Sequence, residues 1–335
     1  MKIIFTLFLF SSLCKVYIAG QVVNLYSAQK EHLIRPVLDK FTETSGIKVR
    51  MITGKAAGLV TRIEREGKYS PVDVLLTTDI GNIYQAKTKG LLQPVKSSIL
   101  QNNIPEYLRG PDNDWFGFTM RARVLFFNKD HLPKMPINYL SVSDKSFMKD
   151  VLISSSSNVY NQSLMAYVLH HYGWKKARRW AKGIVKNMAR KPQGGDRDQI
   201  RAVASGEGKV AVANSYYYGV MVDSKRPTFD QNVRQKTMIT FPQDKPGVHV
   251  NIRGGGLATH SKNRENGIKL LEFLSSEPAQ KLFTKLNLEY PVNPRVKPAD
   301  LLKNWGAFKK DETSLETIGA LQAKAIEIMD WAGWK

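Results

Sequence analysis

The sequence predicts an α/β protein of two lobes, each with a mixed sheet flanked by helices, joined by strands rather than by a flexible tether. Three observations support this prediction. The chain has 335 residues, which is enough for about two domains. Strand-like apolar runs alternate with amphipathic helical patterns along most of it. One extended run, residues 116–127, is too long for a typical strand and suits a segment that crosses between lobes.

The N-terminus has the pattern of a secretory signal peptide. A basic start, Met1-Lys2, precedes an apolar run from Ile3 to Phe10 and a small-residue end at Ala19-Gly20. We expect cleavage after Ala19 or Gly20, which gives an exported, soluble chain with no membrane span. The only cysteine, Cys14, lies inside this segment. The mature chain would then have no thiol, which excludes disulfides, thiolate metal sites and cysteine nucleophiles.

In the first half, strands and helices alternate as in a largely parallel sheet. Strands are predicted at residues 22–26, 47–52 and 73–78, each followed by a helix with apolar residues at helical spacing. Pro36 is tolerated only near the first turn, so the first helix should begin near Lys30 or Glu31. Gly46 follows as its stop signal.

The second half repeats this alternation. A strand at 151–153 leads through the polar loop 154–158 to one helix that ends at Gly173 and another at 174–188. Asp196 is expected to cap a further helix. The remaining predicted elements are strands at 209–213, 248–251 and 256–259, helices around 270–274 and 279–283, and a last helix at about 315–331.

Three consecutive tyrosines occur in the segment Asn214-Ser215-Tyr216-Tyr217-Tyr218-Gly219. A continuing strand would turn Tyr216 and Tyr217 to opposite faces. Asn214 and Ser215 are good N-cap residues, so we expect the tyrosines at a strand-to-helix turn on the carboxyl edge of a sheet. Open α/β folds bind ligands at that edge. The alternative is that the rings only line a cleft wall or pack under a helix.

Composition and motifs narrow the function classes. The formal net charge is +21, but Lys and Arg are scattered. The densest run, residues 175–179, lies on a predicted helix and is more typical of a solvated face than of a nucleic-acid reader. The sequence contains no G-x-S-x-G, H-E-x-x-H or P-loop motif, and its histidines lack zinc spacing. We therefore do not expect an enzyme or a nucleic-acid-binding protein.

The chemistry that remains is that of tyrosine. Tyr160 follows a serine-rich loop after one strand, and Tyr216 and Tyr217 follow another strand in the same half. Phenolates are hard oxygen donors suited to Fe(III). A bidentate carbonate or bicarbonate would fill open positions, held by a helix N-terminus and by Arg121 and Arg123 on the crossing strand. For these arginines the alternative is an exposed strand face with salt bridges.

The chain resembles the periplasmic ferric-ion-binding proteins of bacterial iron ABC transporters, which have the type II periplasmic-binding-protein fold. The resemblance covers essentially the whole mature chain. It rests on the following segments: Tyr26-Ser27, Ser70 to Thr77, Trp115 to Phe118, Arg121 to Val124, Tyr160-Asn161-Gln162-Ser163-Leu164, Ala189 to Asp196, and Asn214 to Gly219. It implies a transferrin-like site in which Tyr160, Tyr216 and Tyr217 bind iron. Tyr218 is not implied as a ligand.

One segment departs from the family pattern. Some members add a histidine and a tyrosine or glutamate from the first lobe, but here that stretch reads Gln29-Lys30-Glu31-His32. The chain thus resembles the subgroup with three tyrosines and a synergistic anion. We expect Gln29 to face the cleft and contribute to the anion site, with Glu31 and His32 structural.

The resemblance also implies an organisation and a partner. We expect a signal peptide at 1–20, an N-lobe at 21–120 plus 243–295, and a C-lobe at 121–242 plus 296–335. The protein would be a periplasmic monomer that delivers Fe(III) to an ABC permease in the inner membrane. One alternative is a binding protein for an oxyanion or an organic cation, with tyrosines lining the cleft. A secreted hydrolase is the other, for which no nucleophile or acid–base pair is evident.

Overall fold

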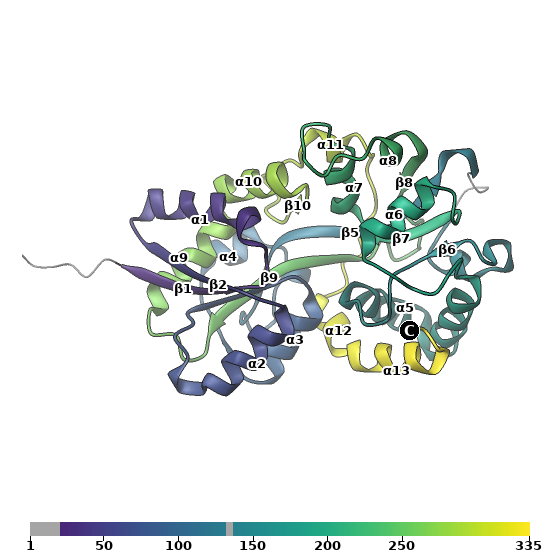
Figure 1. Ribbon diagram of the computed structural model, residues 1–335. Helices are drawn as coiled ribbons and strands as arrows, with labels where there is room; N and C mark the ends of the chain where they lie inside the picture. The colour runs from purple at the N-terminus through teal and green to yellow at the C-terminus, as the bar shows by residue number, and fades with distance from the viewer. Residues whose placement is uncertain (1–20, 132–136) are drawn as a thin grey trace, which may run out of the picture.

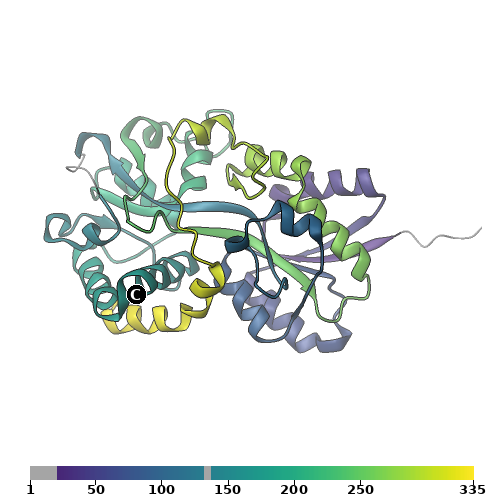
Figure 2. The same cartoon turned by 180° about the vertical axis from the view of Figure 1, so that it is seen from behind.

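The computed structural model describes residues 21–131 and 137–335. The predicted signal peptide and Cys14 lie outside these residues. The chain forms two lobes, and the long strands β5 (Phe116–Asn128) and β9 (Val250–Ala258) connect them (Figures 1 and 2). The predicted fold class and the crossing role of residues 116–127 are therefore confirmed. The limits of the two lobes stay a prediction, and we keep the names N-lobe and C-lobe for them.

The N-lobe sheet is mixed. Strand β1 (Val22–Ser27) pairs in parallel with β2 (Lys48–Thr53) and with β3 (Val74–Thr77). Strand β9 then runs antiparallel to both β3 and β5. Two short strands complete it, β4 (Leu92–Gln93) on β9 and β10 (Tyr290–Pro291) on β5. The parallel arrangement of the first three predicted strands is confirmed.

The C-lobe sheet is built on the far end of β5. Strands β7 (Val210–Asn214) and β8 (Thr237–Thr240) pair antiparallel with it. Strand β6 (Val151–Leu152) pairs in parallel with β7. The carboxyl ends of β6 and β7 therefore lie at the same edge of this sheet, which is the edge where both tyrosine segments begin.

Helices flank both sheets. Helix α1 (Glu31–Ser45) begins where Pro36 predicts, and it ends at Gly46 with φ 71°, a left-handed value that suits glycine. Helix α5 (Val159–Asn187) is broken at Gly173, as the sequence predicts. The remaining helices are α2 (Ala56–Glu66), α3 (Ile80–Thr88), α4 (Ser98–Asn103), α6 (Asp196–Ala204), α7 (Ser215–Val222), α8 (Gln231–Lys236), α9 (Arg264–Ser275), α10 (Glu277–Asn287), α11 (Asp300–Lys303), α12 (Leu315–Ala320) and α13 (Gln322–Ala332).

Three predictions are wrong in detail. The strands predicted at 248–251 and 256–259 are one strand, β9, with Gly254, Gly255 and Gly256 inside it. Glycine is required there by close backbone approach, because a Cβ on Gly255 would lie 1.7 Å from the carbonyl oxygen of Leu75. The predicted last helix is two helices, α12 and α13.

The third wrong prediction concerns Asp196. This residue does not cap a helix but is the first residue of α6, after Gly195 at the N-cap. Its carboxylate accepts instead from the backbone N–H of Asn214 at 2.9 Å and from Arg123. The side chain is therefore committed to pairing with strands β7 and β5.

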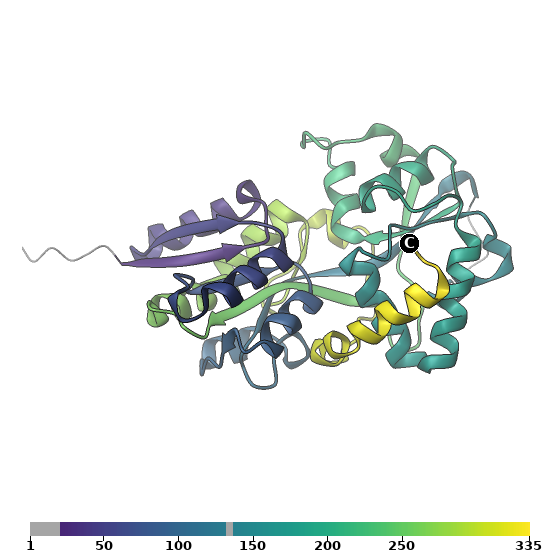
Figure 3. The ribbon, with the colours of Figure 1, turned by 60° about the horizontal axis from the view of Figure 1, so that its bottom comes forward.

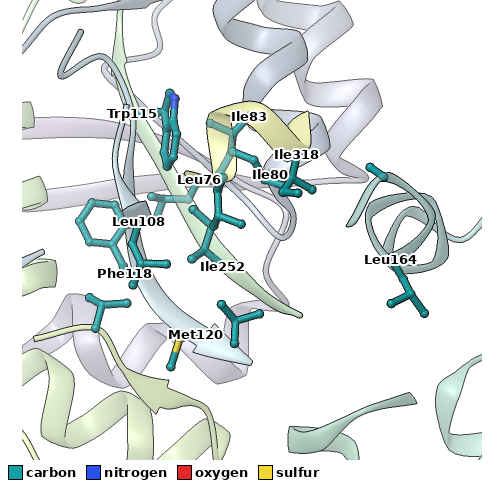
Figure 4. Close-up of a cluster of buried hydrophobic side chains, with 14 of the residues drawn as sticks. Leu76, Ile80, Ile83, Leu108, Trp115, Phe118, Met120, Leu164, Ile252 and Ile318 are labelled. Carbon is teal, nitrogen blue, oxygen red and sulfur yellow. The ribbon is translucent and has the colours of Figure 1, made fainter. Parts of the chain in front are cut away.

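The core runs through both lobes. Figure 4 shows buried apolar side chains of β3, α3, β5 and β9 gathered together, with Ile318 of α12 beside Ile80 and Ile83 of α3. Helix α12 packs against both α3 and α5, while α13 lies along α5 on the face that Figure 3 turns toward the viewer. Helix α12 thus bridges the junction of the lobes. None of the helices in residues 21–131 and 137–335 combines the length and apolar character needed to span a bilayer.

Candidate functional site

Both tyrosine segments lie where a C-lobe strand ends and a helix begins. Strand β7 ends at Asn214, and α7 begins at Ser215, which places Tyr216 and Tyr217 in its first turn. Asn214 occupies the predicted N-cap position, but its side chain makes no capping hydrogen bond. Tyr160 lies in the first turn of α5, where its backbone N–H donates to the side chain of the N-cap Asn158 at 2.9 Å.

Tyr216 and Tyr217 lie together and Tyr218 lies apart. The first two rings have centroids 4.1 Å apart and are inclined by 32°. Neighbours on a helix are separated by about 100°, so two adjacent rings can share one side. Tyr218 is buried, packs on Phe126 and donates its hydroxyl to the carbonyl of Thr237 at 3.0 Å. Its hydroxyl is therefore already engaged in the core.

The three candidate phenols lie within electrostatic reach of one another. Burial raises the pKa of Tyr216 well above its usual value, and the charges of Tyr160 and Tyr217 raise it further. The charges of Arg121 and Arg253 lower this pKa but do not offset the burial. Burial also raises the pKa of Tyr217, again with a contribution from Tyr160. Without a cation Tyr216 and Tyr217 are thus held neutral, and a metal ion that favours phenolate would displace their protons.

Arg121 is the basic group of this cluster. Its guanidinium carbon lies 5.0 Å from the ring centroid of Tyr160, and the side chain is 1% exposed. Nη2 donates to the carbonyl oxygen of Thr78. Nη1 and Nε have no hydrogen-bond partner in the part of the chain that the structure describes. Its acidic neighbours, Asp79 and Glu289, are 3.8 and 3.9 Å away. Arg121 therefore has N–H groups left for a ligand.

Arg123 is placed differently. Nη1 donates to Asp196, and Nη2 donates to Asn161 Oδ1 at 2.5 Å and to the carbonyl oxygen of Val212 at 3.2 Å. Only Nε lacks a partner among the described residues. This arginine links β5, α5, α6 and β7 into one unit, so its guanidinium mainly holds the elements that present the tyrosines.

Gln29 follows strand β1 at the carboxyl edge of the N-lobe sheet. It is 3% exposed, yet neither its side-chain oxygen nor its nitrogen has a partner among residues 21–131 and 137–335. Buried amides are normally hydrogen-bonded, so this pair of free atoms is available to a ligand or water. Glu31 is committed to a surface ion pair with Arg35 at 2.5 Å.

The sequence analysis missed Asp79, which joins the two lobes. It caps α3 by accepting from Gly81 N–H at 2.8 Å, and its Oδ1 also accepts from the Ser163 hydroxyl of α5 at 2.8 Å. Burial raises its pKa to about 6, with Arg121 opposing. An Asp directly after a buried strand and before an apolar helix start is a capping signal that would have identified it.

The sequence analysis also missed two arginines near the tyrosines. Arg197 of α6 lies 5.4 Å over the ring of Tyr217. Arg253 of β9 is buried, bonded to Glu289, and lowers the pKa of Tyr216. Arg253 lies between the strands predicted at 248–251 and 256–259, so the sequence carried no signal that it would be buried. Together with Arg121 they surround the phenols with positive charge.

The donor set fits a hard cation with an accompanying anion. Within the described ranges, no group of three or more His, Cys, Asp or Glu residues could hold a metal ion. The clustered phenols supply three hard oxygens at this edge, and phenolate oxygens suit trivalent iron. Free N–H groups on Arg121 would favour a bound anion beside it.

Comparisons with known proteins agree in sequence and in structure. A family model described as bacterial extracellular solute-binding protein matches residues 70–307. The chain is 44% identical over 317 residues to iron uptake protein A1 of Synechocystis, covering 94% of this chain and 88% of that protein.

Solved structures superpose closely. One is the Trichodesmium protein IdiA (FutA) in complex with iron and citrate ligands, with a TM-score of 0.89, 44% identity and coverage of 94% and 100% of the two chains. Another is ferric iron-binding protein A of Mannheimia haemolytica in an open conformation, with a TM-score of 0.87, 40% identity and coverage of 94% and 99%.

Proposed function

The chain belongs to the bacterial extracellular solute-binding proteins, and from that premise we propose that it binds Fe(III) between its lobes for import. The observation that carries the proposal is the convergence of Tyr160, Tyr216 and Tyr217 at one sheet edge beside a buried arginine with free N–H groups. Relatives at 44% identity that are named for iron uptake, or solved with iron and citrate, support it.

The three phenolates would be the protein ligands of the iron. Each loses a proton on binding, because burial keeps at least Tyr216 and Tyr217 protonated without metal. Three phenolates balance the charge of Fe(III) and leave about three of six octahedral positions open. These positions would accept a synergistic anion such as carbonate or bicarbonate.

The anion would bind beside Arg121 and the first turn of α5. Arg121 offers Nη1 and Nε, and the helix start offers backbone N–H groups and a favourable dipole. Gln29 would approach from the N-lobe with its two unpartnered polar atoms. We assign Arg123 mainly to holding Asp196 and Asn161, since its Nη atoms already donate to them.

Closure of the lobes would complete the site. The hydrogen bond from Ser163 to Asp79 is a contact that the two lobes make across the cleft edge. Closing excludes water and couples loading to recognition by a membrane permease. A relative from Serratia marcescens, 27% identical, is named as a periplasmic Fe(3+)-binding protein, which supports a periplasmic location and, with the solute-binding family, an ABC permease partner.

A titration followed by visible absorption tests this proposal. Mature protein receives Fe(III) without added anion, with bicarbonate, or with citrate. We expect a broad tyrosinate-to-iron charge-transfer band that saturates at one iron per protein and requires one of the anions. A folded protein that shows no band under any of these conditions would contradict phenolate ligation and favour an oxyanion or organic ligand.

A further inference from the structure

The second half of α5 carries a stripe of basic side chains. After the break at Gly173, residues at positions i, i+4, i+7 and i+11 fall on one helix face. These residues are Lys175, Arg179, Lys182 and Lys186, and all are exposed. Ala177, Trp180, Ala181 and Ile184 cover the opposite, buried face. The stripe runs for about 16 Å along the helix axis.

This stripe has no acidic side chain on its own helix. The 29 residues of α5 include no Asp or Glu. None of the four basic side chains forms a salt bridge within the described part of the chain, whereas Arg35, Arg62 and Lys89 elsewhere pair with nearby carboxylates. Surfaces that serve only solubility usually mix both signs of charge. The stripe therefore concentrates positive charge on one face of the C-lobe.

Two exposed tryptophans adjoin the stripe. Trp174 on α5 is 41% exposed, and Trp331 on α13 is 47% exposed. Arg178 lies over both, with its guanidinium carbon 3.6 Å from the Trp331 centroid and 5.8 Å from that of Trp174. Lys182 of the stripe also lies 4.7 Å from the Trp331 centroid. We call the stripe, Arg178 and these two rings the basic–aromatic surface.

The surroundings leave this surface open. In Figure 3, α13 lies on the near face of the C-lobe and runs along α5 from α12, at the lobe junction, to the far end of that lobe. Helix α13 carries exposed Glu327 and Asp330, but neither forms a salt bridge with the stripe. Tyr160 lies at the other end of α5, so contacts made here would leave the iron site free.

We propose that the basic–aromatic surface binds the anionic headgroups of a phospholipid bilayer. Lysine and arginine attract anionic lipids, and tryptophan favours the boundary between headgroups and acyl chains. The exposed rings of Trp174 and Trp331 beside the basic side chains favour a lipid surface over an acidic peptide, because tryptophan partitions to the boundary region of a bilayer. Because no described helix can span a bilayer, the association would be peripheral and reversible.

This inference goes beyond the proposed function and explains how a carrier would find its permease. Peripheral binding would keep the protein on the membrane that contains its partner, while the cleft stays accessible. Electrostatic attraction of this kind weakens as salt rises. Iron ligation plays no part in it, so iron-free and iron-loaded protein should bind equally.

Co-sedimentation with vesicles tests the proposal. Full mature protein is mixed with phosphatidylcholine vesicles, with or without phosphatidylglycerol, at low and high salt. We expect sedimentation only with phosphatidylglycerol, reduced by salt. The triple variant Lys175→Gln/Arg179→Gln/Lys182→Gln should lose at least about tenfold in vesicle affinity. Trp174→Ala/Trp331→Ala should also weaken binding although it leaves the charge unchanged.

A matched control separates this surface from net charge. Lys262, Lys269 and Lys285 are exposed on the N-lobe side without a salt bridge in the described chain, so changing all three to Gln removes the same charge. This control should keep vesicle affinity within about twofold. Equal losses in both triple variants would overturn the proposal, as would no binding of the parent. If the Lys175→Gln/Arg179→Gln/Lys182→Gln variant binds vesicles like the parent but delivers iron more slowly to a reconstituted permease, the proposal is overturned. That result would assign the surface to an acidic protein partner instead.

Discussion

The two lobes bring different chemistry to the edge where they meet. The C-lobe presents phenols at the first turns of α5 and α7, beside parallel strands β6 and β7. The N-lobe presents an amide, Gln29, and a buried carboxylate, Asp79, after its parallel strands β1 and β3. The same architecture, parallel strands that end at one edge, thus carries the proposed cation ligands on one side and hydrogen-bonding groups on the other.

This difference indicates that the two lobes have separate roles in iron binding and in closure. The phenols belong to one lobe, so their positions do not depend on closure. The N-lobe groups meet the site only across the lobe junction, where Ser163 donates to Asp79. We therefore expect C-lobe changes to alter iron affinity strongly, and N-lobe changes to alter closure, anion dependence and stability.

The largest effect is expected from the phenols. Tyr160→Phe or Tyr217→Phe removes one anionic oxygen while keeping the ring, and should weaken Fe(III) binding by roughly 100-fold or more. Competition against citrate, followed at the charge-transfer band, measures it. Tyr218→Phe is the matched control, because its hydroxyl bonds only Thr237 in the described chain and should leave iron affinity unchanged. Equal affinity in all three variants would contradict the ligand assignment.

The two arginines provide the next test. Arg123→Gln leaves the buried Asp196 without its ion-pair partner and should lower the free energy of unfolding by about 3–5 kcal/mol. Arg121→Gln should cost less stability, since its acidic neighbours are 3.8 and 3.9 Å away, but should abolish the effect of bicarbonate on the iron band. Urea unfolding and the spectral titration measure the two outcomes. A loss of bicarbonate dependence in stably folded Arg123→Gln alone would reverse the roles proposed for the two arginines.

The raised pKa of Asp79 predicts that the free energy of unfolding depends on pH. Its folded pKa of about 6 lies above the ordinary value of 3.8, so the native state holds this proton more tightly than the unfolded state. Its stabilising contribution is complete below about pH 4, falls as the pH rises to about 6, and is lost above, a change of roughly 3 kcal/mol. The free energy of unfolding falls between pH 4 and 7.5 in the parent. In Asp79→Asn this fall should be smaller by roughly 3 kcal/mol. Equal pH profiles of urea unfolding would contradict it.

The smallest effect is expected at Gln29. Gln29→Leu removes two buried polar atoms that have no described partner, so iron-free protein should gain about 1 kcal/mol in unfolding free energy. If the amide approaches the anion, the same variant should weaken anion-dependent iron binding by less than about tenfold. Denaturation and iron competition on one preparation measure both. A destabilised variant would show that the amide is already satisfied in the free protein.

The sequence was informative wherever the signal was local. Alternating patterns located the strands, Pro36 and Gly46 located the ends of α1, and three adjacent tyrosines marked the start of α7. It was misleading at residues 248–259, where two strands were predicted and the structure has one strand, β9, with Gly254–Gly256 inside it. There the deciding contact is with Leu75, which is distant in sequence.

The sequence by itself thus determined the α/β class, the crossing strand and the tyrosine-bearing turns, because periodicity and capping depend on neighbouring residues. Only the tertiary structure decided that Arg121 keeps free N–H groups while Arg123 is held by Asp196 and Asn161. Only the fold also brought Asp79 to Ser163. The physical reason is that burial and pairing of charges are set by partners dozens of residues away, which no local pattern encodes.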